Sequence, residues 1–261
     1  MISLIIAVYK NAQALDLILQ SVQLQTFLDI EVIIAEDGED PNMKVCIDAA
    51  IQRYSFPIKH ITHPDLGFRK IVIGNQAIQK AQGEYLVFID GDCFLHPRFL
   101  ESYHKAMRPG NFYFGRRVLL GNDITKRIYE TKSLTIPSFM SLMRSDSTQI
   151  RESLYLPFLP IKEKQDREIW GCNWGVYKQH ILDVNGFDED YVLPCFGEDL
   201  DIDWRLAALG LKRYSLKNKA IQYHLHHTQI WDADIEAQGR TLYDAKRSNG
   251  LMRCLNGIVK C

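Results

Sequence analysis

The sequence predicts an α/β fold in which helices flank a mostly parallel sheet. Through the first half of the chain, apolar runs rich in β-branched residues alternate with segments of helical periodicity. Several of these runs show no polar alternation, which is typical of strands buried on both faces. A chain of 261 residues with 46% hydrophobic content can form one such domain.

Strands and helices are expected to alternate over the first 90 residues. The predicted strands are 2–9, 31–35, 58–62 and 84–89, and the predicted helices are 12–25, 41–54 and 71–81. The first helix carries Leu15, Ile18, Leu19 and Val22 on one face. The apolar run 85–89 is expected to form a central strand.

The alternation breaks near residue 121 and returns near residue 170. Pro137, Pro157 and Pro160 interrupt this stretch, and its helical patterning is mixed, so we expect a helical excursion or a flap. Helical periodicity returns at 201–209.

Composition narrows the function classes. The formal net charge of -1 gives no reason to expect nucleic acid as a partner. Six cysteines form no Cys-x-x-Cys pair, which favours reduced thiols in a cytoplasmic protein. The start has no basic leader, and no apolar stretch reaches membrane-spanning length. We therefore expect a soluble intracellular chain.

The segment 240–260 is locally basic, with five cations against the single carboxylate of Asp244. A solvated helix face is the favoured interpretation, and a peripheral contact with an anionic membrane surface is the alternative.

Three predicted strands end in residues that suit a binding site, namely Val8-Tyr9, Glu36-Asp37-Gly38 and Asp90-Gly91-Asp92. Ligands bind at the carboxyl ends of strands in such sheets. Side chains two apart on a strand point the same way, so Asp90 and Asp92 predict an oxygen site for Mg²⁺ or Mn²⁺. A strand-ending turn explains the same residues equally well.

Two later stretches also carry candidate residues. Glu198 and Asp199 follow Gly197 where a loop meets a helix, so they either face a pocket or form an acidic first turn. For His224 and His227, in HLHH, the residues alone favour packed or exposed histidines at a strand end over metal ligation.

Eight segments in order carry a family resemblance: SLIIAVYKN, EVIIAEDG, DLGFRKIVIGNQAI, GEYLVFIDGDCFLHPRFL, GRRVLL, GCNWGVYKQHILDVNGFDEDY, FGEDLDIDWRL and HLHH. Over residues 2–228 the chain resembles inverting glycosyltransferases of family 2 with the GT-A fold. The most similar subgroup is typified by the N-terminal transferase domain of bacterial chondroitin polymerase.

The resemblance implies a UDP-sugar donor, whose binding residues include Val8 and Gly91. Asp37 would hydrogen-bond the uracil ring, and Tyr9 would pack near the base. Asp90 would contact ribose or the water shell of a metal. The family usually has aspartate where this chain has Glu36, which leaves the role of this first acid open.

Arg69 and Trp170 have two interpretations each. The guanidinium of Arg69 suits ribose or phosphate, and a surface salt bridge is equally expected. Trp170 lies in a segment that frames the sugar pocket in the family, and a buried core indole is the alternative.

The resemblance also implies a divalent metal, Mn²⁺ or Mg²⁺, with Asp92 as a direct ligand. His227 would complete the metal site, and His224 would be a second ligand or its support. Asp199 would be the general base, and Glu198 would orient the acceptor. Single in-line displacement would invert the anomeric centre.

The resemblance favours UDP-GalNAc or UDP-galactose as donor, and a saccharide or lipid-linked oligosaccharide as acceptor in polysaccharide, capsule or lipopolysaccharide synthesis.

We expect a nucleotide-sugar-binding half at 1–118, the excursion at 121–168, an acceptor half at 169–228 and a helical tail at 229–261. A nucleotidyltransferase is an alternative, but AVYKNAQ lacks the glycines of a phosphate-binding loop. The second alternative is a protein that binds nucleotide sugars but has no transferase activity.

Overall fold

The computed structural model describes residues 1–164, 166, 168–194, 196–228 and 232–260. The large sheet contains β1 (Ile2–Val8), β2 (Ile30–Glu36), β3 (Ile58–Thr62), β4 (Tyr85–Asp90), β6 (Asn111–Phe114), β8 (Lys162–Glu163), β9 (Asn173–Tyr177) and β10 (Lys212–Ser215). The small sheet contains β5 (Cys93–Leu95), β7 (Arg116–Leu119) and β11 (Ile221–His224).

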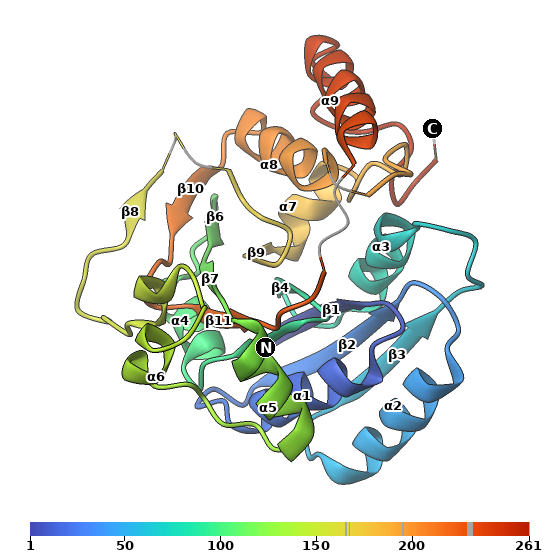
Figure 1. The fold of residues 1–261 in the computed structure, drawn as a ribbon. Helices are drawn as coiled ribbons and strands as arrows, with labels where there is room; N and C mark the ends of the chain where they lie inside the picture. Colours follow the sequence, from blue (N-terminus) through green and yellow to red (C-terminus); the bar gives the residue numbers. More distant parts are fainter. Residues whose placement is uncertain (165, 167, 195, 229–231, 261) are drawn as a thin grey trace.

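Helices surround both sheets (Figure 1). They are α1 (Ala12–Gln23), α2 (Pro41–Arg53), α3 (Lys70–Lys80), α4 (Phe99–Ala106), α5 (Asn122–Thr131), α6 (Phe139–Met143), the 3₁₀ turn η1 (Ile150–Ser153), α7 (Lys178–Asp183), α8 (Glu198–Ala208) and α9 (Ala233–Ser248). In the part of the chain that the structure describes, no helix combines the length and the apolar character needed to cross a membrane.

The predicted α/β fold is confirmed. The large sheet has the order β3-β2-β1-β4-β9-β6-β10-β8, and its first four strands are parallel. Strand β9 runs antiparallel to both β4 and β6, which makes the sheet mixed. The strands and helices predicted over the first 90 residues are all present, with ends that differ by at most two residues.

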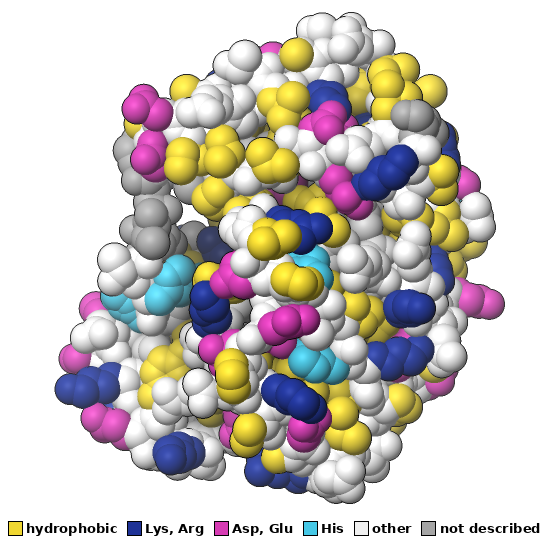
Figure 2. Space-filling model, turned by 90° about the vertical axis from the view of Figure 1, so that its right-hand side faces the viewer, with side chains coloured by type: hydrophobic (Ala, Val, Ile, Leu, Met, Phe, Trp, Pro, Cys, Tyr) yellow, Lys and Arg dark blue, Asp and Glu magenta, His cyan; other side chains and the backbone are white. Residues whose placement is uncertain are grey.

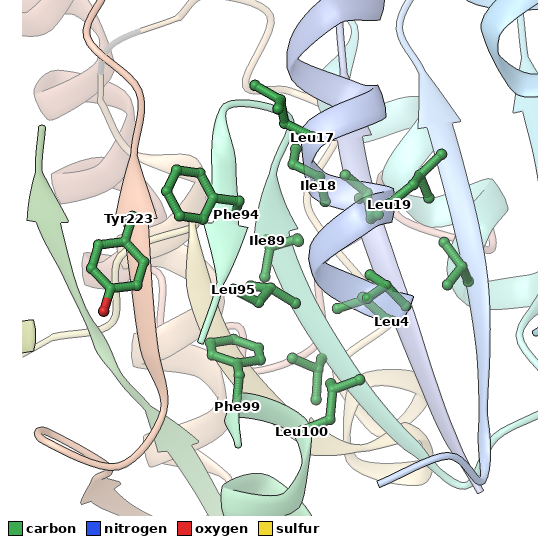
Figure 3. Packing of buried hydrophobic residues seen from close by; sticks show 14 of the residues in the cluster. Leu4, Leu17, Ile18, Leu19, Ile89, Phe94, Leu95, Phe99, Leu100 and Tyr223 are labelled. Carbon is green, nitrogen blue, oxygen red and sulfur yellow. The ribbon is translucent and has the colours of Figure 1, made fainter. Parts of the chain in front are cut away.

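The large sheet is buried on both faces, as its apolar strands predict. Leu4 and Ile6 of β1 pack in one core with α1 and α2, whereas Ile5 packs in a second core with α3. Figure 3 shows Leu4 and Ile89 facing side chains of α1 in the first of these cores. Because side chains alternate along a strand, a wholly apolar strand supplies both cores.

The parallel strands end level with one another. Val8 of β1 pairs with Glu36 of β2, and Ala7 pairs with Asp90 of β4. Gly91 follows where the chain passes close to β1, and a Cβ atom there would lie 2.8 Å from the carbonyl oxygen of Ala7. The glycine between the two aspartates is therefore required by close packing.

Helix α8 is anchored by a buried arginine. Arg205 donates to Asp201 Oδ2 at 2.7 Å and to the carbonyl oxygens of Val184 and Gly186 at 2.7 and 2.8 Å. Arg205 and Asp201 are each 1% exposed. These bonds tie α8 to the turn that follows α7, and so fix the helix that begins with Glu198.

We expect Arg205→Met to lower the free energy of unfolding by about 3–5 kcal/mol, because it leaves the Asp201 carboxylate buried without its cation. Urea denaturation measures this loss. The exposed Arg144→Met serves as control and should change stability by less than about 0.5 kcal/mol. Adding Asp201→Leu to Arg205→Met should restore part of the loss; equal stability of Arg205→Met and the parent would contradict the anchoring role.

Candidate active site

A cavity of about 540 Å³ opens at the carboxyl ends of β1, β2 and β4. Its lining includes seven of the predicted site residues, namely Val8, Tyr9, Asp37, Asp90, Gly91, Asp92 and His227. Figure 2 shows a face of the molecule on which acidic, basic and histidine side chains gather around a hollow. We call the cavity of about 540 Å³ the main cavity.

Asp92, His224 and His227 form a cluster at the edge of the main cavity. The Nε2 atoms of His224 and His227 lie 3.2 and 3.1 Å from Asp92 Oδ2. One ligand atom from each residue lies within 4.8 Å of the other two. The small sheet creates this cluster, because β11 pairs with β5 and sets His224 opposite Cys93, next to Asp92.

The cluster has the donors of a divalent metal site. Burial acts to raise the pKa of Asp92, but hydrogen bonds from His224 and His227 hold it well below its usual range, so the carboxylate is ionised. One carboxylate and two imidazoles suit a first-row ion such as Mn²⁺ better than Mg²⁺, which prefers oxygen ligands alone. The residues therefore fit the metal that the resemblance implies, with Mn²⁺ favoured.

Asp37 is held in place from two directions. His63 Nε2 lies 2.8 Å from its Oδ1 atom, and the backbone N–H of Arg69 donates to Oδ2 at 2.8 Å. The lining of the main cavity includes Phe68 and Lys70 but does not include Arg69. Arg69 precedes the first residue of α3, and its backbone N–H holds Asp37 in place.

Glu36 lies buried beside the site. Its Oε2 atom lies 2.7 Å from His60 Nε2, and its Oε1 atom accepts the backbone N–H of Asp40 at 2.8 Å. The first acid of EDG therefore supports the turn into α2, whereas Asp37 faces the cavity.

Tyr9 lies at the rim and is 53% exposed. Its hydroxyl donates to Asp65 at 3.2 Å, and the ammonium of Lys10 lies 2.6 Å from the same carboxylate. Tyr9 also lines the main cavity.

Lys70 is a site residue that the sequence analysis missed. Its Nζ atom lies 2.8 Å from Asp90 Oδ1. Burial acts to lower the pKa of Lys70, but the charges of Asp90, Glu198 and Asp199 raise it well above its usual range. The only signal in the sequence was a second cation directly after Arg69.

Glu198 and Asp199 begin α8 close to the main cavity. A small cavity of about 30 Å³ is lined by both acids, and it shares Lys70 and Asp90 with the main cavity. Asp199 Oδ2 accepts the backbone N–H of Gly171 at 3.0 Å. Lys70 therefore lies between the strand-end aspartate and the two acids.

The two acids have perturbed titrations. Burial and the charge of Asp199 raise the pKa of Glu198 to about 7. Burial also raises the pKa of Asp199, which the N–H of Gly171 and the charge of Lys70 partly offset. Perturbed carboxyls beside a cavity are typical of catalytic sites.

Trp170 does not line the main cavity, and its indole is not buried in the core. It is 38% exposed and lines a second cavity of about 450 Å³. The guanidinium carbons of Arg116 and Arg117 lie 4.4 and 5.5 Å from the centre of its ring.

The tertiary structure thus brings ten of the twelve predicted site residues to the main cavity, the small cavity or the metal cluster. Trp170 lines the second cavity instead, and Arg69 lines neither cavity although its backbone N–H binds Asp37.

Comparisons with known proteins agree with this architecture. Over 249 residues the chain is 28% identical to chondroitin synthase of Escherichia coli. This match covers 85% of this chain and 34% of that protein. Over 102 residues it is 32% identical to the putative glycosyltransferase EpsH of Bacillus subtilis, covering 39% and 28% respectively. The chain spans about a third of the length of these curated relatives.

The fold is similar to that of a solved mannosyltransferase. The structure of PcManGT from Pyrobaculum calidifontis, in complex with GDP-Man and Mn²⁺, matches with a TM-score of 0.62. The match covers 95% of this chain and 64% of that chain at 14% identity. It supports the predicted GT-A fold.

A family model described as Glycosyl transferase family 2 matches residues 3–158. The matched range contains Asp37, Asp90 and Asp92, whereas Asp199 and His227 lie beyond it. Because the match spans more than half of the chain, this protein belongs to glycosyl transferase family 2.

Proposed function

We propose that this protein is a metal-dependent inverting glycosyltransferase that moves a sugar from a UDP-sugar to a hydroxyl of a saccharide acceptor. The observation that carries the proposal is the cluster of Asp92, His224 and His227 at the edge of a cavity whose lining also includes Asp37. A volume of about 540 Å³ is in the range of cavities that enclose small-molecule ligands.

The donor would lie along the carboxyl edge of the sheet. Asp37, oriented by His63, accepts a hydrogen bond from the uracil ring, and Tyr9 packs against the base. Asp90 faces the ribose, and Gly91 lets the donor approach the backbone near Val8. For Arg69 we propose that the side chain contacts the ribose or a phosphate of the donor.

The metal cluster would lie where the diphosphate leaves. Asp92, His224 and His227 would hold Mn²⁺, which when bound supplies Lewis-acid stabilisation of the departing nucleoside diphosphate. Among the chain's own groups, Lys70 adds positive charge between Asp90 and the acid pair.

Asp199 is our candidate for the general base. The N–H of Gly171 holds its Oδ2 atom, and the nearby ammonium of Lys70 favours its ionised form. A carboxylate there removes the proton of the acceptor hydroxyl as this oxygen attacks the anomeric carbon. Glu198, with a pKa of about 7, orients the acceptor by hydrogen bonding.

The donor sugar is proposed from similarity alone. The family resemblance of the sequence motifs favours UDP-GalNAc or UDP-galactose, and the structure of PcManGT, which holds GDP-Man, adds GDP-mannose to the donors worth testing. The acceptor is proposed as a saccharide or lipid-linked oligosaccharide in polysaccharide, capsule or lipopolysaccharide synthesis.

The proposed division of the chain agrees with where these groups come from. Residues within 1–118 supply every lining residue of the main cavity except His227, and 169–228 supply the acid pair. The segment 121–168, proposed as an excursion or flap, contains α5, α6 and η1.

We propose a cytoplasmic location, near the inner face of the membrane where lipid-linked acceptors occur. Two cations of the basic tail are paired within the protein, since Lys246 lies 2.7 Å from Asp188 and Arg240 lies 3.1 Å from Glu236. This pairing favours a solvated helix face over a contact with an anionic membrane surface. Arg253 also donates to the carbonyl oxygen of Leu182 at 2.7 Å. A peripheral membrane contact through this tail would have to break such pairs.

The central test is a donor screen with UDP-sugars and GDP-mannose, scored by release of the nucleoside diphosphate with and without Mn²⁺. We expect release from one UDP-sugar that needs Mn²⁺ and increases with a saccharide acceptor. Metal-dependent thermal stabilisation by donors without any release would favour a binding protein. Formation of a nucleotide sugar from a nucleoside triphosphate would favour a nucleotidyltransferase.

His227→Ala should weaken Mn²⁺ binding by about 10–100-fold, because it removes one of three clustered ligands. Titration calorimetry with Mn²⁺ measures this change. His226→Ala is the matched control, since its side chain lies outside the cluster one residue away. Undiminished Mn²⁺ affinity in His227→Ala would remove this residue from the metal site.

Asp199→Asn should reduce kcat by about 10²–10⁴-fold while the dissociation constant of the donor stays unchanged, because an amide cannot accept the acceptor's proton. Single-turnover kinetics and donor titration separate the two effects. The exposed Asp234→Asn on α9 should leave both unchanged. Near-parental turnover in Asp199→Asn would exclude Asp199 as the base.

A further inference from the structure

The stretch that carries His227 leaves the small sheet before it reaches the metal cluster. Strand β11 ends at His224, and the next backbone N–H, that of Leu225, still donates to the carbonyl oxygen of Asp92 at 2.9 Å. Side chains three residues apart on an extended strand point to opposite faces. Both His224 and His227 nevertheless approach Asp92 Oδ2, at 3.2 and 3.1 Å. The backbone therefore changes direction between Leu225 and His227.

Helix α5 holds the backbone where this change of direction occurs. The N–H of His226 donates to the Oγ1 atom of Thr125 at 2.9 Å. Thr125 lies on α5 and is 3% exposed. Because a closely packed side chain on a helix has little freedom to move, its hydroxyl gives this N–H a partner in a fixed position. The bond therefore fixes the backbone one residue before His227.

Helix α5 is itself anchored at both ends. At its start, the backbone N–H of Asn122 donates to Asp146 Oδ2 at 3.1 Å. At its end, the side chain of Gln13 on the neighbouring helix α1 donates to the carbonyl oxygen of Tyr129 at 3.1 Å (Figure 1). Two buried isoleucines between these ends pack in the same core as α1. Thr125 therefore lies on a helix whose position is set by α1 and by the segment that follows α5.

We infer that Thr125 is a positioning residue of the metal cluster, which holds the N–H of His226 so that the side chain of His227 reaches Asp92. This inference rests on the proposed metal-dependent function, because it assigns the support of the same metal site. It also gives the excursion at 121–168, through α5, a part in building the site. None of the eight segments that carry the family resemblance includes Thr125, so the resemblance gives no sign of this role.

Thr125→Val should weaken Mn²⁺ binding about tenfold, because valine has nearly the shape of threonine but no hydroxyl to accept the N–H of His226. Thr125→Ser keeps the hydroxyl and should bind Mn²⁺ as the parent does. Thr131→Val is the matched control and should also leave the affinity unchanged, since the Thr131 hydroxyl donates to the carbonyl oxygen of Ile128 within the same helix at 3.1 Å. Titration calorimetry of the full chain with Mn²⁺ alone measures all of these affinities.

A double-mutant cycle separates positioning from general destabilisation. In the His227→Ala background, Thr125→Val should change the dissociation constant of Mn²⁺ by less than about twofold, because the ligand that Thr125 positions is already absent. A threonine that only stabilised the fold would weaken Mn²⁺ binding equally in both backgrounds. Thermal unfolding checks that each variant is folded at the temperature of the titration.

Two results would overturn the inference. One is parental Mn²⁺ affinity in Thr125→Val, and the other is an equal loss of affinity with and without His227. Release of nucleoside diphosphate from the donors is measured in parallel on the parent.

The outcomes distinguish this inference from the proposed function. If His227→Ala weakens Mn²⁺ binding and Thr125→Val does not, the role of Thr125 alone is rejected. If the cycle gives the expected result but no donor is cleaved, the proposed transferase activity is rejected and the role of Thr125 is retained. Absence of Mn²⁺ binding by the parent would reject both the metal site and its positioning residue.

Discussion

The parallel pairing of β1 with both β2 and β4 is the constraint on which the site depends. It brings the ends of three strands to one level, so that Val8, Glu36 and Asp90 lie at the same edge of the sheet. The backbone hydrogen bonds of a parallel ladder fix this register, and a slip by one residue would turn every side chain to the opposite face. Asp37 and Asp92, one and two residues past these strands, then face one cavity.

The small sheet adds the part of the site that comes from the far end of the chain. Pairing of β11 with β5 sets His224 opposite Cys93, and His227 reaches Asp92 from three residues farther along. The hydrogen-bonded ladder therefore brings Asp92 together with two histidines more than 130 residues later in the sequence, and these three side chains could hold a metal ion. Such a set is available only in the folded chain, so metal binding would also stabilise the fold.

Lys70 links the two halves of the site electrostatically. It lies 2.8 Å from Asp90 and is close enough to Glu198 and Asp199 for their charges to raise its pKa. Three carboxyls around one cavity repel one another, and a single ammonium between them lowers the cost of keeping any of them ionised. Burial and the charge of Asp199 still raise the pKa of Glu198 to about 7, so this carboxyl changes its protonation near neutral pH.

The sequence by itself determined the fold class, the strands of the first half and the pair Asp90 and Asp92, because these follow from periodicity and from side-chain alternation along a strand. It did not determine that His224 joins Asp92, since the residues alone favoured packed histidines. That outcome depends on the β5–β11 register, which is a contact between distant segments.

The position of Trp170 outside the main cavity and the place of Lys70 between the acids were likewise decided by tertiary structure. Local pattern predicts which face of an element a residue occupies. Which distant charges and cavities meet that face is decided only when the sheets pair and the helices pack.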